Sequence, residues 1–192
     1  EYSRDRMVSE FKEIFEYLEK NDPLHLLYIK FISFNFLRPV EVNRLLVKSI
    51  NLKEKKLSVK TKTNKLKTKI IPDILLQELP DLSQLNQDNY LFTPNGLGLE
   101  WVAEENNRRD SFSKRFKTVI KDHFNLGSEY GLYSFRHTFI TKLYRNLREN
   151  KSPHETKGIL MNITGHVTMD ALEKYLRDID AELPEDYSNL FR

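Results

Sequence analysis

Residues 133–139 read YSFRHTF, with an arginine and a histidine side by side between two phenylalanines. The stretch begins a helix that we predict over residues 134–147. Taken alone, Arg136 is an unremarkable residue, because arginine is common on amphipathic helices. The stretch indicates a function only in combination with charged and polar segments elsewhere in the chain.

Most of the chain shows the apolar spacing of helices, and one early stretch shows the alternation of strands. Residues 23–34 are apolar nearly all round, so we expect a buried helix with proline in its first turn. Between residues 50 and 71, short alternating runs surround lysine-rich turns, which predicts a small antiparallel sheet. Residues 80–109 carry proline and glycine breakers and are predicted to be mostly loop. The other predicted helices are 7–20, 39–47, 73–79, about 112–124, 153–162 and one that Thr168 caps.

The fold class is therefore α+β, mainly α-helical, with a small antiparallel sheet after the first helices. The chain has 192 residues, enough for one domain with a sizeable core. It has no cysteine, which excludes disulfides and thiolate metal sites, and no apolar run long enough to cross a membrane.

The charge of the chain is unevenly distributed. The net charge is only +3, but residues 53–69 hold eight lysines and one acid, while residues 1–22 and 170–192 are net acidic. A concentrated basic patch of this kind is typical of a polyanion binder. A solvated lysine-rich hairpin is an equally acceptable interpretation of the charge alone.

Four segments supply groups suited to phosphoryl transfer without a metal ion. The transition state spreads negative charge over phosphate oxygens, and an arginine fork meets that charge with two hydrogen bonds. Arg38 and Arg136 lie in two of the segments, and the lysine-rich residues 60–72 offer acids for a departing oxygen. In the fourth, His166 ends a predicted Thr-Gly-His turn, and Tyr175 follows it by nine residues as a candidate nucleophile.

Together these segments resemble the catalytic domain of the tyrosine recombinases, the phage integrase family. That family carries a G-L-R-x-x-E segment, a lysine on a β-hairpin, an H-x-x-R-H-T segment, an L-G-H turn and a tyrosine nine residues past that histidine. All five features occur here in the same order, over about residues 7–180. Each has a commonplace interpretation by itself, but unrelated chains rarely place all five together.

The resemblance implies a role for each matching residue. Tyr175 would attack a DNA phosphodiester and form a 3′-phosphotyrosine, and Lys62 would protonate the 5′-hydroxyl that leaves. Three residues would hold the scissile phosphate: Arg38, Arg136 and His166. Tyr133 would assist them. The residues that would contact DNA are Lys60, Lys65 and Lys67, and those that would support the site are Glu41 and His137. The resemblance further implies no metal or other cofactor, and double-stranded DNA as the partner.

Three features depart from the family pattern or leave a choice open. Asn35-Phe36 stands where the family usually has a glycine, and we expect Asn35 to adopt the positive φ, because phenylalanine rarely does. Tyr133 replaces a histidine, and a neutral phenol is a poorer base than imidazole at pH 7. Lys60 and Lys62 would lie on one face of a strand, so either could be the general acid. We prefer Lys62 because a threonine follows it near the turn, as in the family.

The expected organisation is a catalytic domain over residues 1–180 and a tail, residues 181–192, that docks on a neighbouring subunit or on its own domain. The family's N-terminal core-binding domain is expected to be absent from this chain, so DNA binding would be weak and mainly to phosphates. The full-length protein would self-associate on DNA as a tetrameric synapse. The expected setting is the bacterial cytoplasm, at the nucleoid, during integration or excision of a mobile element.

Two other functions remain open at this point. A degenerate member of the same family would bind DNA without cutting it. The departures from the family pattern at Phe36 and Tyr133 are consistent with that alternative. A metal-dependent nuclease would need carboxylates or histidines that converge on a cation, whereas the acids here concentrate toward the two ends of the chain.

Overall fold

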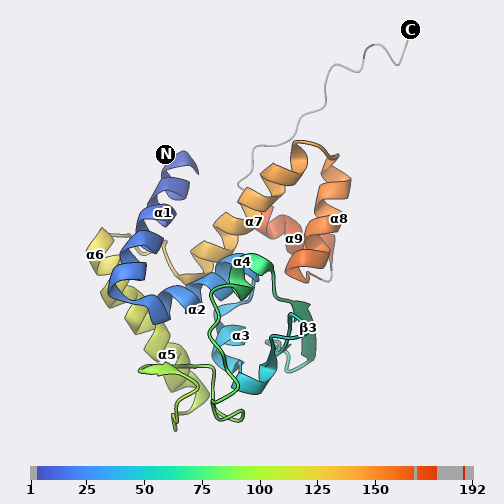
Figure 1. Cartoon of the computed structure of the whole chain (residues 1–192). Helices are drawn as coiled ribbons and strands as arrows, with labels where there is room; N and C mark the ends of the chain where they lie inside the picture. The colour runs from blue at the N-terminus through green and yellow to red at the C-terminus, as the bar shows by residue number, and fades with distance from the viewer. Residues whose placement is uncertain (1–3, 167, 177–187, 189–192) are drawn as a thin grey trace. The chain divides into compact units, whose positions relative to one another are not determined.

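Helices make up most of the chain, with one small antiparallel sheet after the first three helices, as the sequence predicts (Figure 1). The computed structural model describes residues 4–166, 168–176 and 188. The chain divides into two units, residues 1–139 and residues 140–192. The division falls inside helix α7 (Leu132–Arg148), and the predicted catalytic domain, residues 1–180, includes residues of both units.

The first two helices meet at an aspartate that caps the second. α1 spans Arg4–Asn21 and α2 spans Pro23–Phe34. The Asp22 carboxylate accepts a hydrogen bond of 3.1 Å from the backbone N–H of His25, which satisfies a donor in the first turn of α2. As its apolar sequence predicts, α2 is buried on nearly every side and packs against four other helices. Its carboxyl end is thereby fixed within the first unit.

Helix α3 spans only Pro39–Arg44, shorter than the predicted 39–47. The chain leaves the helix because its next residues bond to another segment: the Leu45 carbonyl accepts from Leu91, and the Val47 N–H donates to Asn89. A short 3₁₀ turn, η1 (Val47–Ser49), follows. Tertiary pairing has overridden the helical pattern of the sequence here.

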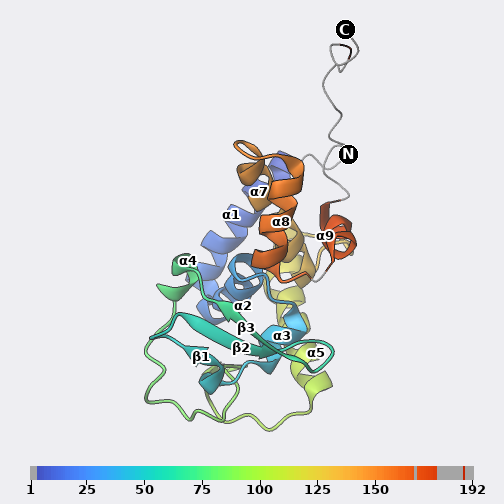
Figure 2. The same cartoon turned by 90° about the vertical axis from the view of Figure 1, so that its right-hand side faces the viewer.

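The predicted sheet is present and has three antiparallel strands in the order β1-β2-β3 (Figure 2). Its strands are β1 (Ile50–Asn51), β2 (Lys56–Lys60) and β3 (Leu66–Ile70). β2 alternates between buried and solvated positions, with Leu57 and Val59 facing the core. Lys62 lies past the end of β2, in the turn, so the prediction that Lys60 and Lys62 share a strand was wrong. The chain turns back early because Thr61 accepts a hydrogen bond from Asn64 and donates one to Lys65.

The loop-rich stretch that follows contains more structure than its glycines and prolines indicate. After α4 (Asp73–Leu76) comes a small hairpin, β4 (Phe92–Thr93) and β5 (Gly96–Leu97). α5 (Glu105–Phe116) starts inside the predicted loop and continues through a π-helical turn, η2 (Lys117–Lys121), into α6 (Asp122–Phe124). Buried side chains from these elements join others from α2, β2, α7 and the end of α3 in the core of the first unit: Ile29, Phe31, Leu45, Leu57, Phe92, Phe112, Ile120 and Phe135.

The second unit contains the end of α7 and two helices, α8 (Pro153–Thr164) and α9 (Met169–Leu176). Ser152 caps α8 through a capping box with Glu155, and Gly165 ends it with φ 74°, a left-handed conformation that suits glycine. Thr168 caps α9, as predicted, by accepting a hydrogen bond from the N–H of Ala171. Leu172 and Leu176 on the predicted apolar stripe are buried, and Ile179 lies outside the described residues.

Candidate active site

The turn between α2 and α3 has an unusual backbone conformation. Phe36 has φ 55°, in the left-handed region that residues with side chains rarely adopt, whereas Asn35 has φ −103° and continues the helical conformation of α2 as its C-cap. The expectation that Asn35 would adopt the positive φ was therefore wrong. Phe36 tolerates the conformation because its side chain is buried, at 6% exposure, and apolar burial offsets a strain of about 1–3 kcal/mol.

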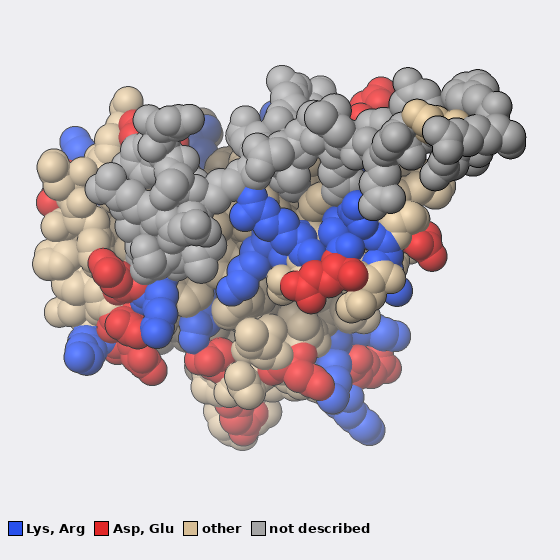
Figure 3. Space-filling view, turned by 90° about the horizontal axis from the view of Figure 1, so that it is seen from above, with Lys and Arg blue, Asp and Glu red and all other residues tan. Residues whose placement is uncertain are grey.

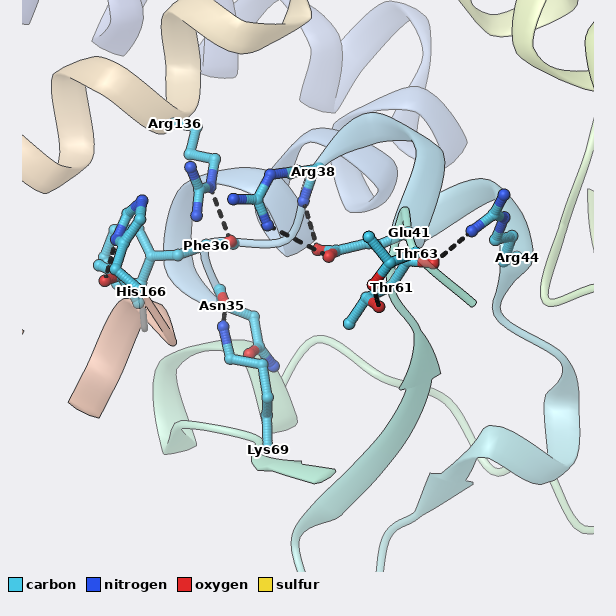
Figure 4. A network of polar contacts seen from close by, with 11 residues as sticks. Asn35, Phe36, Arg38, Glu41, Arg44, Thr61, Thr63, Lys69, Arg136 and His166 are labelled. Carbon is cyan, nitrogen blue, oxygen red and sulfur yellow. Dashed lines mark hydrogen bonds and ion pairs between the residues drawn. The ribbon is translucent and has the colours of Figure 1, made fainter. Parts of the chain in front are cut away.

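Arg136 reaches this turn from the first turns of α7 and is fully buried. Its Nε–H donates a hydrogen bond of 2.8 Å to the Phe36 carbonyl, which joins two residues 100 positions apart in the sequence (Figure 4). An arginine stays protonated even when buried, so the protein must supply such partners. The bond fixes one edge of the guanidinium, and Nη1 and Nη2 carry its remaining donors.

Arg38 is held by the acid one turn further along. Glu41 accepts a bond of 2.8 Å from the backbone N–H of Arg38 at one carboxylate oxygen, and its other oxygen lies 3.3 Å from Nη1 of the same arginine. Glu41 is almost fully buried, whereas the Arg38 side chain is 31% exposed. The carboxylate thus both caps α3 and orients the arginine.

Two lysines of β3 also face this region. Lys67 pairs with the buried Val59 and Lys69 with the buried Leu57, and directly opposite residues of antiparallel strands project to the same face. Lys69 Nζ donates a hydrogen bond of 2.5 Å to the Asn35 carbonyl.

Both β3 lysines have depressed pKa values. Burial lowers the pKa of Lys69 to about 7, and the positive charges of Lys67, Arg136 and Arg38 act in the same direction, opposed by Glu41. Burial also lowers the pKa of Lys67, and Arg38 and Arg136 add to that effect. The two lysines therefore share one electrostatic neighbourhood with both arginines.

The hairpin tip, residues 60–65, is solvated by contrast. Lys60, Lys62 and Lys65 have exposed side chains. Arg44 at the end of α3 donates to the Thr61 carbonyl and binds Glu105 of α5, which ties the base of the tip to the helices. The tip carries the preferred general acid, Lys62, where solvent surrounds it.

A pocket of about 410 Å³ lies beside the β2–β3 hairpin. Lys60 lines it together with Arg44, Lys48 and Arg108, so a residue that we expected to contact DNA shares the pocket with three other cations. Arg108 also stacks over the ring of Tyr90, another lining residue, at 4.0 Å.

The remaining predicted residues of α7 flank Arg136. Tyr133 lies three residues before it, close to one helical turn, and is 45% exposed. His137 follows Arg136 directly and is partly buried. Tyr133 is therefore a solvent-exposed residue of α7, about one helical turn before the buried Arg136.

In the second unit, His166 is buried and bonded within its own turn. Its Nδ1 lies 2.6 Å from Thr164 Oγ1, and that hydroxyl in turn bonds the Leu160 carbonyl at 2.8 Å. A hydroxyl has a single hydrogen, and the Leu160 carbonyl can only accept. Nδ1 of His166 is thus the donor to Thr164.

Tyr175 lies near the carboxyl end of α9, with its side chain outside what the structure describes. The tail that was expected to dock, residues 181–192, lies outside the described residues except for Ser188, which is exposed. Tyr175 thus lies on a helix, as predicted, nine residues past His166 in the sequence.

On the face drawn in Figure 3, the described residues do not form a patch of a single charge sign. Figure 3 shows lysine and arginine interspersed with aspartate and glutamate on the face that it draws. Among the described residues, no three histidines, aspartates or glutamates gather as metal ligands would. Within that same part of the chain, every helix is too short or too polar to span a membrane.

Two residues near the arginines were missed by sequence reasoning. Lys69 was one of eight lysines in a basic run, and only the strand register, which pairs it with Leu57, shows that it faces inward. Arg44 lies inside the predicted helix 39–47 and was not singled out, yet it anchors the hairpin tip. The inward register of Lys69 follows from Leu57 and Val59 once the turn at Thr61 is known.

Comparison with known proteins identifies the family of the chain. The chain matches the Phage integrase family over residues 7–181, and it belongs to that family. A comparison with curated protein sequences found no match.

Solved structures of similar fold are recombinases and integrases. A XerA recombinase is 17% identical with a TM-score of 0.63 over 87% of this chain and 57% of that one, and a XerH recombinase bound to its difH substrate is 17% identical with a TM-score of 0.59 over 95% and 51%. The catalytic domain of bacteriophage HP1 integrase is 15% identical, with a TM-score of 0.55 over 88% of this chain and 84% of that domain. The chain thus spans little more than half of the two recombinases and most of the HP1 domain.

Proposed function

We propose that this chain is the catalytic part of a site-specific DNA recombinase that cleaves and rejoins DNA through a 3′-phosphotyrosine. The support is family membership together with one structural observation: Arg38 and Arg136, far apart in sequence, are both fixed at a single turn. Two oriented guanidinium groups suit the negative charge that develops on a phosphate under attack.

In the proposed reaction, the Tyr175 hydroxyl oxygen attacks the scissile phosphorus, and its proton passes to solvent. The bond from phosphorus to the bridging 5′ oxygen breaks, and that oxygen takes a proton from Lys62 Nζ. Arg38, Arg136 and His166 bind the non-bridging oxygens, with assistance from Tyr133. Attack by the 5′-hydroxyl of a second strand then reverses each step and joins the DNA to a new partner.

The wider setting is also part of the proposal. Lys60, Lys65 and Lys67 would contact DNA phosphates, and Glu41 and His137 would support the arginines. The full-length protein would act as a tetramer on two duplexes, in the bacterial cytoplasm, to integrate or excise a mobile element. We expect DNA binding mainly through phosphates, so that the affinity falls steeply with salt.

The test is a nicked suicide substrate, in which cleavage releases a short oligonucleotide and traps the enzyme on DNA. After incubation in EDTA, denaturing electrophoresis should show a covalent protein–DNA adduct. DNA binding without an adduct would favour the degenerate DNA-binding protein, for which Tyr133 in place of histidine is the remaining sequence argument. Cleavage that EDTA abolishes would favour a metal-dependent nuclease.

A further inference from the structure

The Asn35–Phe36 turn is held from two sides by buried or half-buried cationic side chains. Lys69 Nζ donates to the Asn35 carbonyl at 2.5 Å, and Arg136 Nε donates to the Phe36 carbonyl at 2.8 Å. Figure 4 shows the lysine reaching the turn from strand β3 and the arginine reaching it from helix α7. Two consecutive peptide carbonyls thus bind two different elements of the first unit.

This turn needs such support because its backbone is strained. The φ of 55° at Phe36 persists only where the surroundings fix it, and the direction of the Phe36 carbonyl depends on that angle. A rotation of the Asn35–Phe36 peptide would turn the Asn35 carbonyl away from Lys69 and change the φ of Phe36, on which the direction of the next carbonyl, bound by Arg136, depends. Arg38 follows two residues later, so its path into α3 depends on the same turn.

The chemistry of Lys69 suits a hydrogen-bond donor better than a phosphate-binding cation. Lys67, Arg136 and Arg38 surround it with positive charge, Glu41 is the acid that opposes them, and burial lowers its pKa to about 7. Above that pH the amine is mostly uncharged, still donates N–H to the Asn35 carbonyl, and adds no further full charge to the cations that surround it.

We propose that Lys69 is a positioning residue, which holds the Asn35 carbonyl so that the strained turn presents the Phe36 carbonyl to Arg136 and sets the direction of Arg38. The proposal rests on the proposed function, because positioning matters only if the arginines bind the reacting phosphate. Lys69 itself touches the turn and not the DNA, so its loss should slow the chemical step and leave DNA affinity and its salt dependence in place.

The first test compares Lys69→Met, which keeps the unbranched stem and removes the donor, with Lys56→Met on the solvated side of β2. At pH 8, adduct formation by Lys69→Met in single turnover should slow by roughly 10- to 100-fold, the cost of a small misplacement of catalytic groups. Its Kd for DNA and its salt slope should stay within about twofold of the parent protein. Lys56→Met should cleave at the parental rate. A parental rate in folded Lys69→Met, or a Kd that weakens as much as the rate, overturns the proposal.

A chemical rescue separates the amine from general packing. The chain contains no cysteine, so Lys69→Cys can be aminoethylated in denaturant at that position alone and refolded, which restores an amine of lysine length. Ethylation of the same variant is the matched control with no amine. Aminoethylation should return the rate to within about threefold of the parent, and ethylation should not. Equal rates for the two products contradict the proposal.

A third readout does not depend on catalysis. The Arg136 Nε–H, assigned by NMR with Arg136→Lys, should exchange with solvent at least about tenfold faster in Lys69→Met, because the turn that holds it is loosened. Unchanged exchange overturns the positioning role. If the parent protein forms no adduct but the exchange rate rises as expected, the proposed function fails and the role of Lys69 in holding the turn stands.

Discussion

The Asn35–Phe36 turn and the hairpin tip both carry proposed catalytic groups, but the protein holds them very differently. At the turn, Lys69 and Arg136 bind consecutive carbonyls in a buried setting. At the tip, Lys62 is exposed, and Arg44 anchors only the backbone at its base. Groups that meet charge developing on a phosphate act best when fixed beforehand, whereas a proton donor can be positioned by the substrate itself. We therefore expect the arginines to be in place before DNA binds and Lys62 to be placed by the DNA.

The largest effect should come from the buried side of the comparison. Arg136→Ala should reduce adduct formation on a suicide substrate by at least about 10³-fold, because both the phosphate donors and the bond to Phe36 are lost. Arg136→Lys keeps the charge without the fork and should still lose roughly 10²-fold. Thermal unfolding of both variants controls for loss of fold. If a folded Arg136→Ala protein cleaves at the parental rate, neither Arg136 nor the turn that it binds contributes to catalysis.

This division between buried and solvated groups also explains what the sequence could predict. The order of motifs identified the family, and helical spacing located α2 and α7 closely, since apolar periodicity is a local property. The positive φ at Phe36 was missed because it depends on contacts with residues far away in sequence, Lys69 and Arg136. The end of α3 was missed for the same reason, since Leu45 pairs with Leu91.

On the solvated side, Lys62→Ala should lower cleavage of ordinary DNA by about 10²- to 10⁴-fold, the range for a positioned general acid. A substrate with sulfur at the bridging 5′ position has a leaving group that needs no proton, so it should restore the rate. Lys60→Ala, the matched variant at the end of β2, should show no such rescue. If the sulfur substrate restores the rate of Lys60→Ala and not of Lys62→Ala, the general acid is Lys60, at the end of β2.

Tyr133 shares one property with each region. Its side chain is exposed, like Lys62, but it belongs to the helix that carries the buried Arg136. Tyr133→Phe should cost at most about 10²-fold in adduct formation, the low end for proton-transfer groups. Tyr133→His should cleave at least as fast as the parent protein, since imidazole is the better base at neutral pH. Loss of activity in Tyr133→His would assign the phenol a specific role that histidine cannot fill.

The smallest effect should come from lysines on the solvated face away from the tip. Lys56→Ala should leave the cleavage rate of bound DNA unchanged and should lower the slope of log Kd against log salt by about one phosphate contact at most. Fluorescence anisotropy at several salt concentrations measures that slope. A cleavage defect as large as that of Lys62→Ala would show that charge, and not position, determines which lysine matters.

The central claim is that Tyr175 is the nucleophile, and mapping the trapped adduct tests it directly. Peptide mapping of the covalent complex should place the DNA on Tyr175, which α9 carries nine residues past His166. Tyr175→Phe should retain fold and DNA binding and form no adduct, because phenylalanine lacks the attacking oxygen. An adduct that maps to Tyr133, Tyr144 or any other residue, or one that forms in Tyr175→Phe, would contradict the mechanism.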